Sequence, residues 1–142
     1  MEERIRIYLE DAKRFVEEAA VEFAEGVKAG DSVKIRDAAE KAWNAVVQAS
    51  NALILKYAGK TPASHWERRR LLRELERAYP ELEKMGLRDR YSARERNLHE
   101  LVFYEGVVDV EDVKVEIEKA RKYVEDVELL LRETAGGNSQ RR

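Results

Sequence analysis

The sequence predicts an all-α fold, an antiparallel (up-and-down) bundle of four to five helices, on three observations. Apolar residues recur at spacings of three and four along most of the 142 residues, which is the period of a helix with one buried face. Most of the glycines and both prolines fall between these stretches rather than within them. The stretches are long and the connections between them are short, which favours antiparallel neighbours.

The first two helices are predicted from residues 2–28 and 33–57. Gly30 ends the first, and the dipeptide Asp31–Ser32 offers an N-cap for the second. Residues 42–55 are apolar on more than one side, so we expect the second helix to lie at the centre of the bundle. The apolar stripe of the first helix consists of Ile5, Tyr8, Leu9, Ala12, Phe15, Val16, Ala19 and Phe23.

Shorter helical segments follow. A third helix is predicted over residues 64–79, where Ser64 and Glu67 have the spacing of a capping box. A single turn at 81–85 leads into a fourth long helix over 89–104. The apolar stripe of the last helix, which begins after residue 109, consists of Val113, Ile117, Ala120, Val124, Val127 and Leu131.

One domain is predicted over residues 1–134. Residues 135–142 contain no apolar anchor, so they are predicted to form a disordered tail. The N-terminus has no apolar segment of signal-peptide length and no stretch could span a membrane, so we expect a soluble cytoplasmic protein. Charged residues make up 39% of the chain and are rich in Glu and Arg, a composition typical of thermophile proteins.

The composition excludes several kinds of chemistry. Cysteine is absent, which rules out thiolate nucleophiles and zinc sites built on sulfur. His65 and His99 are the only histidines, and no carboxylate pattern is dense enough to predict a metal or cofactor site. The net charge is only −2, but residues 64–100 carry 10 Lys and Arg against 8 Asp and Glu. The most basic stretch therefore contains both histidines.

The segment 93–105 holds the residues most suited to chemistry. His99 can move protons near neutral pH, and Arg94 and Arg96 can bind phosphate, so together they could cleave RNA without a metal. Arg96 and His99 share one face of a helix. Arg94 and His99 are roughly 140° apart on a regular helix, so they meet only if the arginine wraps round, the helix start is irregular or a second subunit contributes.

Each of these residues also has a purely structural interpretation. His99 could pack at a helix or subunit boundary while the arginines pair with Glu95 and Glu100. His65, which follows an N-cap, is interpreted as structural. A further stripe at helical spacing either faces RNA phosphates or is a solvated face paired with glutamates, and it consists of Arg69, Arg70, Arg73 and Arg77.

The arrangement Arg94-x4-His99 resembles the Arg-x(4 to 6)-His signature of the HEPN superfamily (higher eukaryotes and prokaryotes nucleotide-binding). Residues 41–53 look like the long central helix of these domains. The string Leu-His-Glu-Leu-Val-Phe-Tyr-Glu at 98–105 is similar to the LHxxFYE end of the archaeal PaREP branch. The resemblance spans nearly the whole chain.

The resemblance implies a helical bundle that forms a homodimer. Active members are metal-independent ribonucleases, often toxins or defence components, in which the Arg and His of both subunits line a cleft at the interface. Carried onto this chain, Arg94 would bind phosphate and His99 would be the acid–base residue. Some toxin members place a tyrosine two residues after the histidine, whereas here that residue is Leu101 and the nearest tyrosine is Tyr104.

Three hypotheses therefore stand side by side. In the first, the dimer binds RNA or a nucleotide and cleaves RNA through Arg94 and His99. In the second, the chain is a non-catalytic interaction module, such as the partner of a small nucleotidyltransferase. In the third, the chain is a helical bundle without any ligand. The expected RNA or phosphate contacts in the first hypothesis are Arg96, Tyr104, Arg70, Arg73 and Arg77.

Overall fold

The computed structural model describes residues 2–136, and these residues form helices without any strand, so the predicted all-α class is confirmed. The last helix continues through residues 135 and 136, and the rest of the predicted tail, residues 137–142, lies outside the described residues. The described elements are α1 (Glu3–Ala29), α2 (Ser32–Ala58), α3 (His65–Ala78), α4 (Pro80–Met85), α5 (Leu87–Arg94), the π-helix η1 (Glu95–Tyr104) and α6 (Val110–Gly136).

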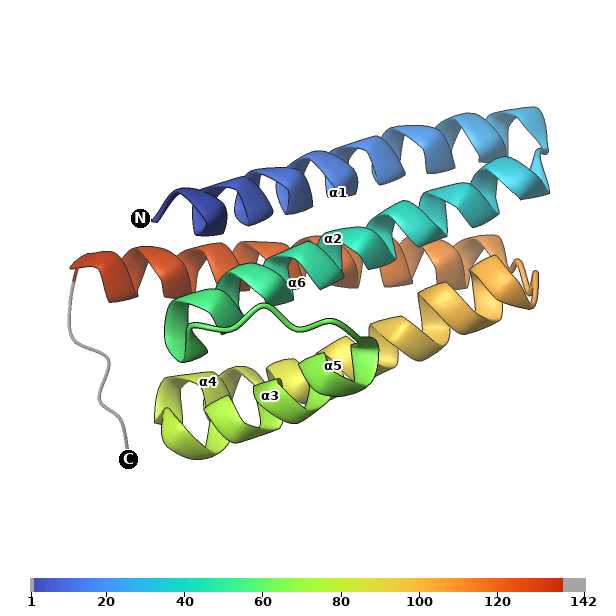
Figure 1. Ribbon diagram of the computed structural model, residues 1–142. Helices are drawn as coiled ribbons and strands as arrows, with labels where there is room; N and C mark the ends of the chain where they lie inside the picture. The colour runs from blue at the N-terminus through green and yellow to red at the C-terminus, as the bar shows by residue number, and fades with distance from the viewer. Residues whose placement is uncertain (1, 137–142) are drawn as a thin grey trace.

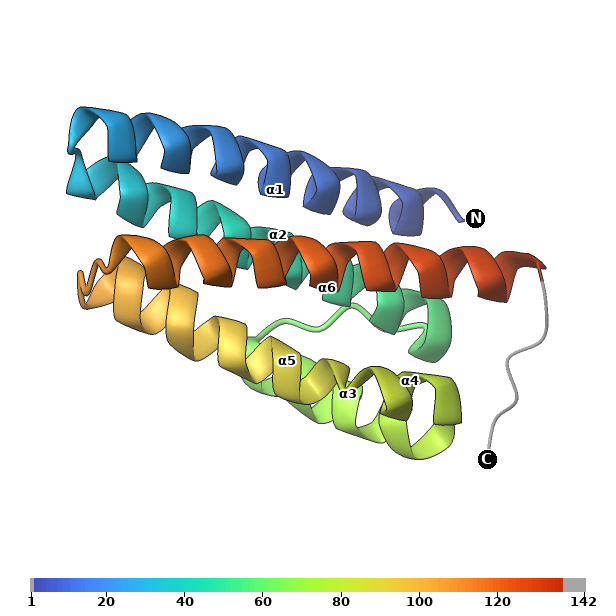
Figure 2. The same cartoon turned by 180° about the vertical axis from the view of Figure 1, so that it is seen from behind.

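The long helices lie side by side (Figures 1 and 2). α1 and α2 run in opposite directions after a tight turn at Gly30, whose φ of 65° favours glycine. α5 and η1 form one continuous leg that runs opposite to α6, and α6 also packs on α1 and α2. Residues 59–64 run back along the molecule, so that α3 packs on both α2 and α5.

The centre of the fold is α2, as its apolar composition predicts. From Ala38 to Leu55 most residues of α2 are buried and none is fully exposed, because α1, α3, η1 and α6 contact it from several sides. The predicted stripe of α1 also faces inward, with Ile5, Leu9 and Val16 buried. Among the helices between residues 2 and 136, none combines the length and the apolar composition that crossing a membrane requires.

Side-chain caps start the helices where the sequence predicts them. The Asp31 carboxylate accepts a hydrogen bond from the backbone N–H of Lys34 at 3.1 Å. The Ser64 hydroxyl accepts from the N–H of Glu67 at 3.1 Å, and the Glu67 carboxylate accepts in return from the N–H of Ala63 at 3.2 Å. The start of α3 is therefore fixed, and with it the position of His65.

The fourth long helix differs from the prediction in its hydrogen bonding. It begins at Leu87, and from Glu95 onward it is a π-helix rather than a regular α-helix. The backbone N–H of Glu105, for example, donates to the carbonyl of Glu100, five residues back, at 2.9 Å. π-Helical segments are rare and frequently occur at functional sites, and this one carries His99.

Candidate functional site

Polar and aromatic side chains gather where α2, α3 and the α5–η1 leg meet. We call this group the histidine cluster, and its members are Glu40, Trp43, His65, Tyr91 and His99. Glu40 and Trp43 are three residues apart on α2, so they share one face of that helix. Tyr91 and His99 are eight residues apart and both face α2, while His65 is the first residue of α3.

His99 is held from two sides within the cluster. Its Nδ1 lies 2.8 Å and 3.1 Å from the two carboxylate oxygens of Glu40. Its ring stacks on Trp43 with a centroid separation of 5.8 Å, and the ring of Tyr104 packs against it in a T-shaped arrangement with a centroid separation of 4.9 Å. These contacts fix the orientation of the imidazole. The His99 side chain is nevertheless 17% exposed, so it still reaches solvent.

His65 lies next to His99, with their ring centroids 5.5 Å apart. Its Nδ1 is 3.1 Å from Nη1 of Arg68 and 3.3 Å from the hydroxyl of Tyr91. Burial lowers the pKa of His65, and the Arg68 charge acts in the same direction. Burial also raises the pKa of Tyr91 to about 12, so its hydroxyl stays protonated and can donate. Local spacing could not place His65 beside His99, because the two rings meet through the packing of α3 and η1 on α2.

Arg94 is directed to the other side of the leg. Its Nη2 lies 3.2 Å from the carboxylate of Glu116 on α6, and both side chains are buried. Asn97, one turn along, donates to the same carboxylate oxygen at 2.5 Å. Within one chain, Arg94 therefore packs against α6 while His99 packs against α2, and the two predicted site residues have separate partners.

The remaining predicted arginines lie on the surface, except that Arg69 is partly buried and pairs with Glu95. Arg96 pairs with Glu100 at 3.3 Å, the local pairing that the sequence predicts as its structural interpretation. Arg70 pairs with Glu74 at 3.0 Å, and its guanidinium lies 5.4 Å from the ring centroid of Trp66. Arg73 and Arg77 are exposed.

Two large aromatic side chains near the histidine cluster are also exposed. Trp66, which follows His65 along the chain, is 64% exposed. Tyr104, which contacts the His99 ring, is 68% exposed. Exposed aromatic rings close to arginines are the combination that proteins use to bind single-stranded nucleic acid, because every base offers a flat face for stacking.

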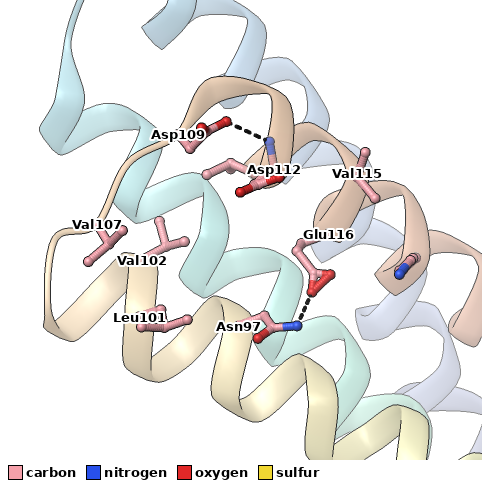
Figure 3. Close-up of a pocket in the computed structure, with 10 residues that line it drawn as sticks. Asn97, Leu101, Val102, Val107, Asp109, Asp112, Val115 and Glu116 are labelled. Carbon is pink, nitrogen blue, oxygen red and sulfur yellow. Dashed lines mark hydrogen bonds between the residues drawn. The ribbon is translucent and has the colours of Figure 1, made fainter.

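A cavity of about 350 Å³ lies between η1 and the start of α6, on the flank that holds Arg94 (Figure 3). Its walls are apolar at Leu101 and Val102, and acidic at Asp112 and Glu116. In Figure 3 the Glu116 carboxylate points to the Asn97 amide. Across residues 2–136 no three His, Asp or Glu side chains are grouped so that they could hold a metal ion.

The fold and the site together define an all-helical domain with a partly exposed histidine–glutamate pair between its central helix and a π-helix. Comparison with known families assigns the chain to one of them. The chain belongs to the archaeal PaREP1/PaREP8 family, whose model matches residues 8–124, a span that includes the whole histidine cluster. No curated protein and no solved structure matches the chain.

Proposed function

We propose that this chain is a HEPN-type domain that binds RNA or a nucleotide as a homodimer, and that His99 transfers protons in metal-independent cleavage of RNA. The observation that carries the proposal is the pair formed by His99 and Glu40. Nδ1 of His99 lies 2.8 Å from Oε1 of Glu40, and the His99 side chain is still partly exposed to solvent. A carboxylate that holds an imidazole in one orientation is a recurring arrangement in acid–base catalysis.

The chemistry follows from the hydrogen bond between the two side chains. The ionised Glu40 carboxylate only accepts, so Nδ1 of neutral His99 carries the hydrogen and Nε2 has a free lone pair. His99 Nε2 takes the proton of a ribose 2′-hydroxyl as the 2′-oxygen forms a bond to phosphorus. The bond from phosphorus to the 5′-oxygen breaks, and that oxygen takes a proton from water. The hydroxide that remains takes the proton from His99 Nε2, which regenerates water and the neutral ring. The products are a 2′,3′-cyclic phosphate and a 5′-hydroxyl.

The phosphate contacts in this proposal come from the exposed arginines rather than from Arg94. Arg96 and Arg70 can release their glutamate partners at little cost, because ion pairs at the surface contribute only about 0–1 kcal/mol, and Arg73 and Arg77 are exposed. Arg94 is tied to Glu116 inside the protein, so we assign it the role of positioning η1. Trp66 and Tyr104 offer faces on which bases can stack.

Incubation of the purified protein with unstructured RNAs in EDTA tests the cleavage. We expect wild type to cleave and His99→Asn to be inactive, because asparagine keeps a donor toward Glu40 but has no group equivalent to Nε2. Arg96→Ala should weaken RNA binding, whereas Arg14→Ala should not, although Arg14 forms the same type of (i, i+4) pair with a glutamate on α1. No cleavage by wild type, or full activity of His99→Asn, would contradict the catalytic proposal.

One observation favours the second candidate function, a non-catalytic interaction module that pairs with a small nucleotidyltransferase. An open cavity of about 600 Å³ lies between α1 and α6, no residue of the histidine cluster lines it, and Phe23, Val27 and Ile117 make much of it apolar. An apolar segment of a partner could fill it. Co-purification from the native host would detect such a complex, and Val27→Asp should disrupt it while leaving RNA binding unchanged.

A further inference from the structure

The hydrogen bonds of His65 fix which of its ring nitrogens carries the proton. A guanidinium only donates, so the His65 Nδ1 that lies 3.1 Å from Nη1 of Arg68 must accept. The neutral ring of His65 therefore has its hydrogen on Nε2. The lowered pKa of His65 agrees with a ring that stays neutral near pH 7.

Arg68 cannot turn away from His65 without a loss elsewhere. Its Nε donates to the side-chain oxygen of Asn51 at 2.8 Å, and both residues are buried between α2 and α3. The Tyr91 hydroxyl, 3.3 Å from the same Nδ1, can donate as well. The orientation and the tautomer of His65 are thus set by a network of neighbours, as the orientation of His99 is set by Glu40.

The two imidazoles therefore have opposite hydrogen-bonding character at Nε2. His99, bound to a carboxylate through Nδ1–H, has a lone pair on Nε2, whereas His65, bound to a guanidinium, has a hydrogen there. Their rings lie 5.5 Å apart at 67°, and both pack on Trp43. Both side chains are partly exposed. An acceptor and a donor are thus placed side by side in the same cluster.

We propose that His65 is a second ligand-contacting residue of this site, and that the pair recognises a ribonucleotide phosphate. His65 Nε2–H donates to a phosphoryl oxygen, while His99 Nε2 accepts from the adjacent 2′-hydroxyl. This proposal rests on the proposed function, because it names the ligand of the same site. The requirement for a 2′-hydroxyl makes the site selective for RNA over DNA, since a deoxyribose leaves the acceptor of His99 without a partner.

The tautomers can be measured without any ligand. In protein labelled with ¹⁵N-histidine at pH 8, long-range ¹H–¹⁵N spectra distinguish the two tautomers of each ring. We expect Nε2–H for His65 and Nδ1–H for His99, with the signals assigned from His65→Gln and His99→Asn variants. Two rings with the same tautomer would overturn the inference, whether or not the protein cleaves RNA.

Binding of a small probe tests the ligand. Wild type should bind uridine 3′-monophosphate at least tenfold more tightly than its 2′-deoxy analogue. His65→Ala should lose at least tenfold in affinity for the ribonucleotide, and His65→Gln should restore much of it, because the glutamine amide places a donor near the position of Nε2. Equal affinity of His65→Ala and wild type would overturn the inference, as would a wild type that binds neither nucleotide.

These outcomes are separable from those of the proposed function. Cleavage that is lost in His99→Asn but unchanged in His65→Ala would leave the proposed function standing and contradict the role of His65. Opposite tautomers and selective nucleotide binding without any RNA cleavage would support the role of His65 and contradict the catalytic part of the proposed function.

Discussion

The buried ion pair between Arg94 and Glu116 gives the sharpest prediction about stability. Their side chains are only 6% and 9% exposed. Glu116→Gln removes the counter-charge of a guanidinium that water can hardly reach, which should cost about 3–5 kcal/mol of unfolding free energy. Arg94→Met keeps most of the side-chain volume, and the Glu116 carboxylate keeps its hydrogen bond from Asn97. This variant should therefore cost about 3 kcal/mol of unfolding free energy, the lower end of that range.

The double variant Arg94→Met/Glu116→Leu separates charge burial from packing. It removes both charges and leaves only the Asn97 amide without its acceptor, so the loss should be about 1 kcal/mol and far below the sum of the single losses. Urea unfolding followed by circular dichroism measures each value.

A matched control for this experiment is Arg132→Met on α6. It breaks an exposed (i, i+4) pair with Glu128 and should stay within about 0.5 kcal/mol of wild type. Additive single losses, or an Arg94→Met variant as stable as the control, would refute the reasoning. Arg94 would then return to the candidate phosphate contacts.

Three other perturbations test the surroundings of the cluster and the core. Arg36→Met removes the guanidinium that donates to the Phe103 carbonyl at 2.6 Å, so hydrogen exchange of the amides at 105–107 should accelerate while α1 amides stay protected. Burial lowers the pKa of His65, so near this pKa the folded state binds fewer protons than the unfolded state. The unfolding free energy should therefore fall as the pH drops below about 6.5. His65→Gln should flatten this dependence in urea titrations. A dependence that persists in the variant would assign it to another group. Tyr123→Phe should cost about 1–3 kcal/mol in urea unfolding by leaving the buried Ser50 hydroxyl, 2.5 Å from the phenol oxygen, without its partner, and adding Ser50→Ala should recover part of the loss.

The helices could be predicted because the signals that define them are local. The stripe of α1, the apolar middle of α2 and the cap at Ser64 all lie within a few turns of the residues they organise. The π-conformation of η1 could not be predicted in this way. Its apolar residues follow a helical spacing that does not distinguish a π-helix from an α-helix, and partners on other helices, such as Arg36 at its C-terminal end, contact its backbone.

The site was predictable only in part, for the same reason. The pairing of Arg96 with Glu100 follows from a spacing of four and is present. The partners of Arg94 and His99 are Glu116 and Glu40, which lie 22 and 59 residues away, and no periodicity connects them. Their choice depends on which helix packs against each side of η1, and that arrangement is a property of the whole fold.

The Arg94 contact with α6 and the His99 contact with α2 together constrain how many residues can separate Arg94 from His99. Deleting one residue between positions 95 and 99 would rotate everything downstream relative to everything upstream by the angle of one residue, which is about 100° in an α-helix and smaller in the wider π-helix, if the helix stayed continuous. Either Arg94 would lose α6 or His99 would lose α2. We therefore expect this stretch to accept many substitutions at its outward positions but no change in the number of its residues.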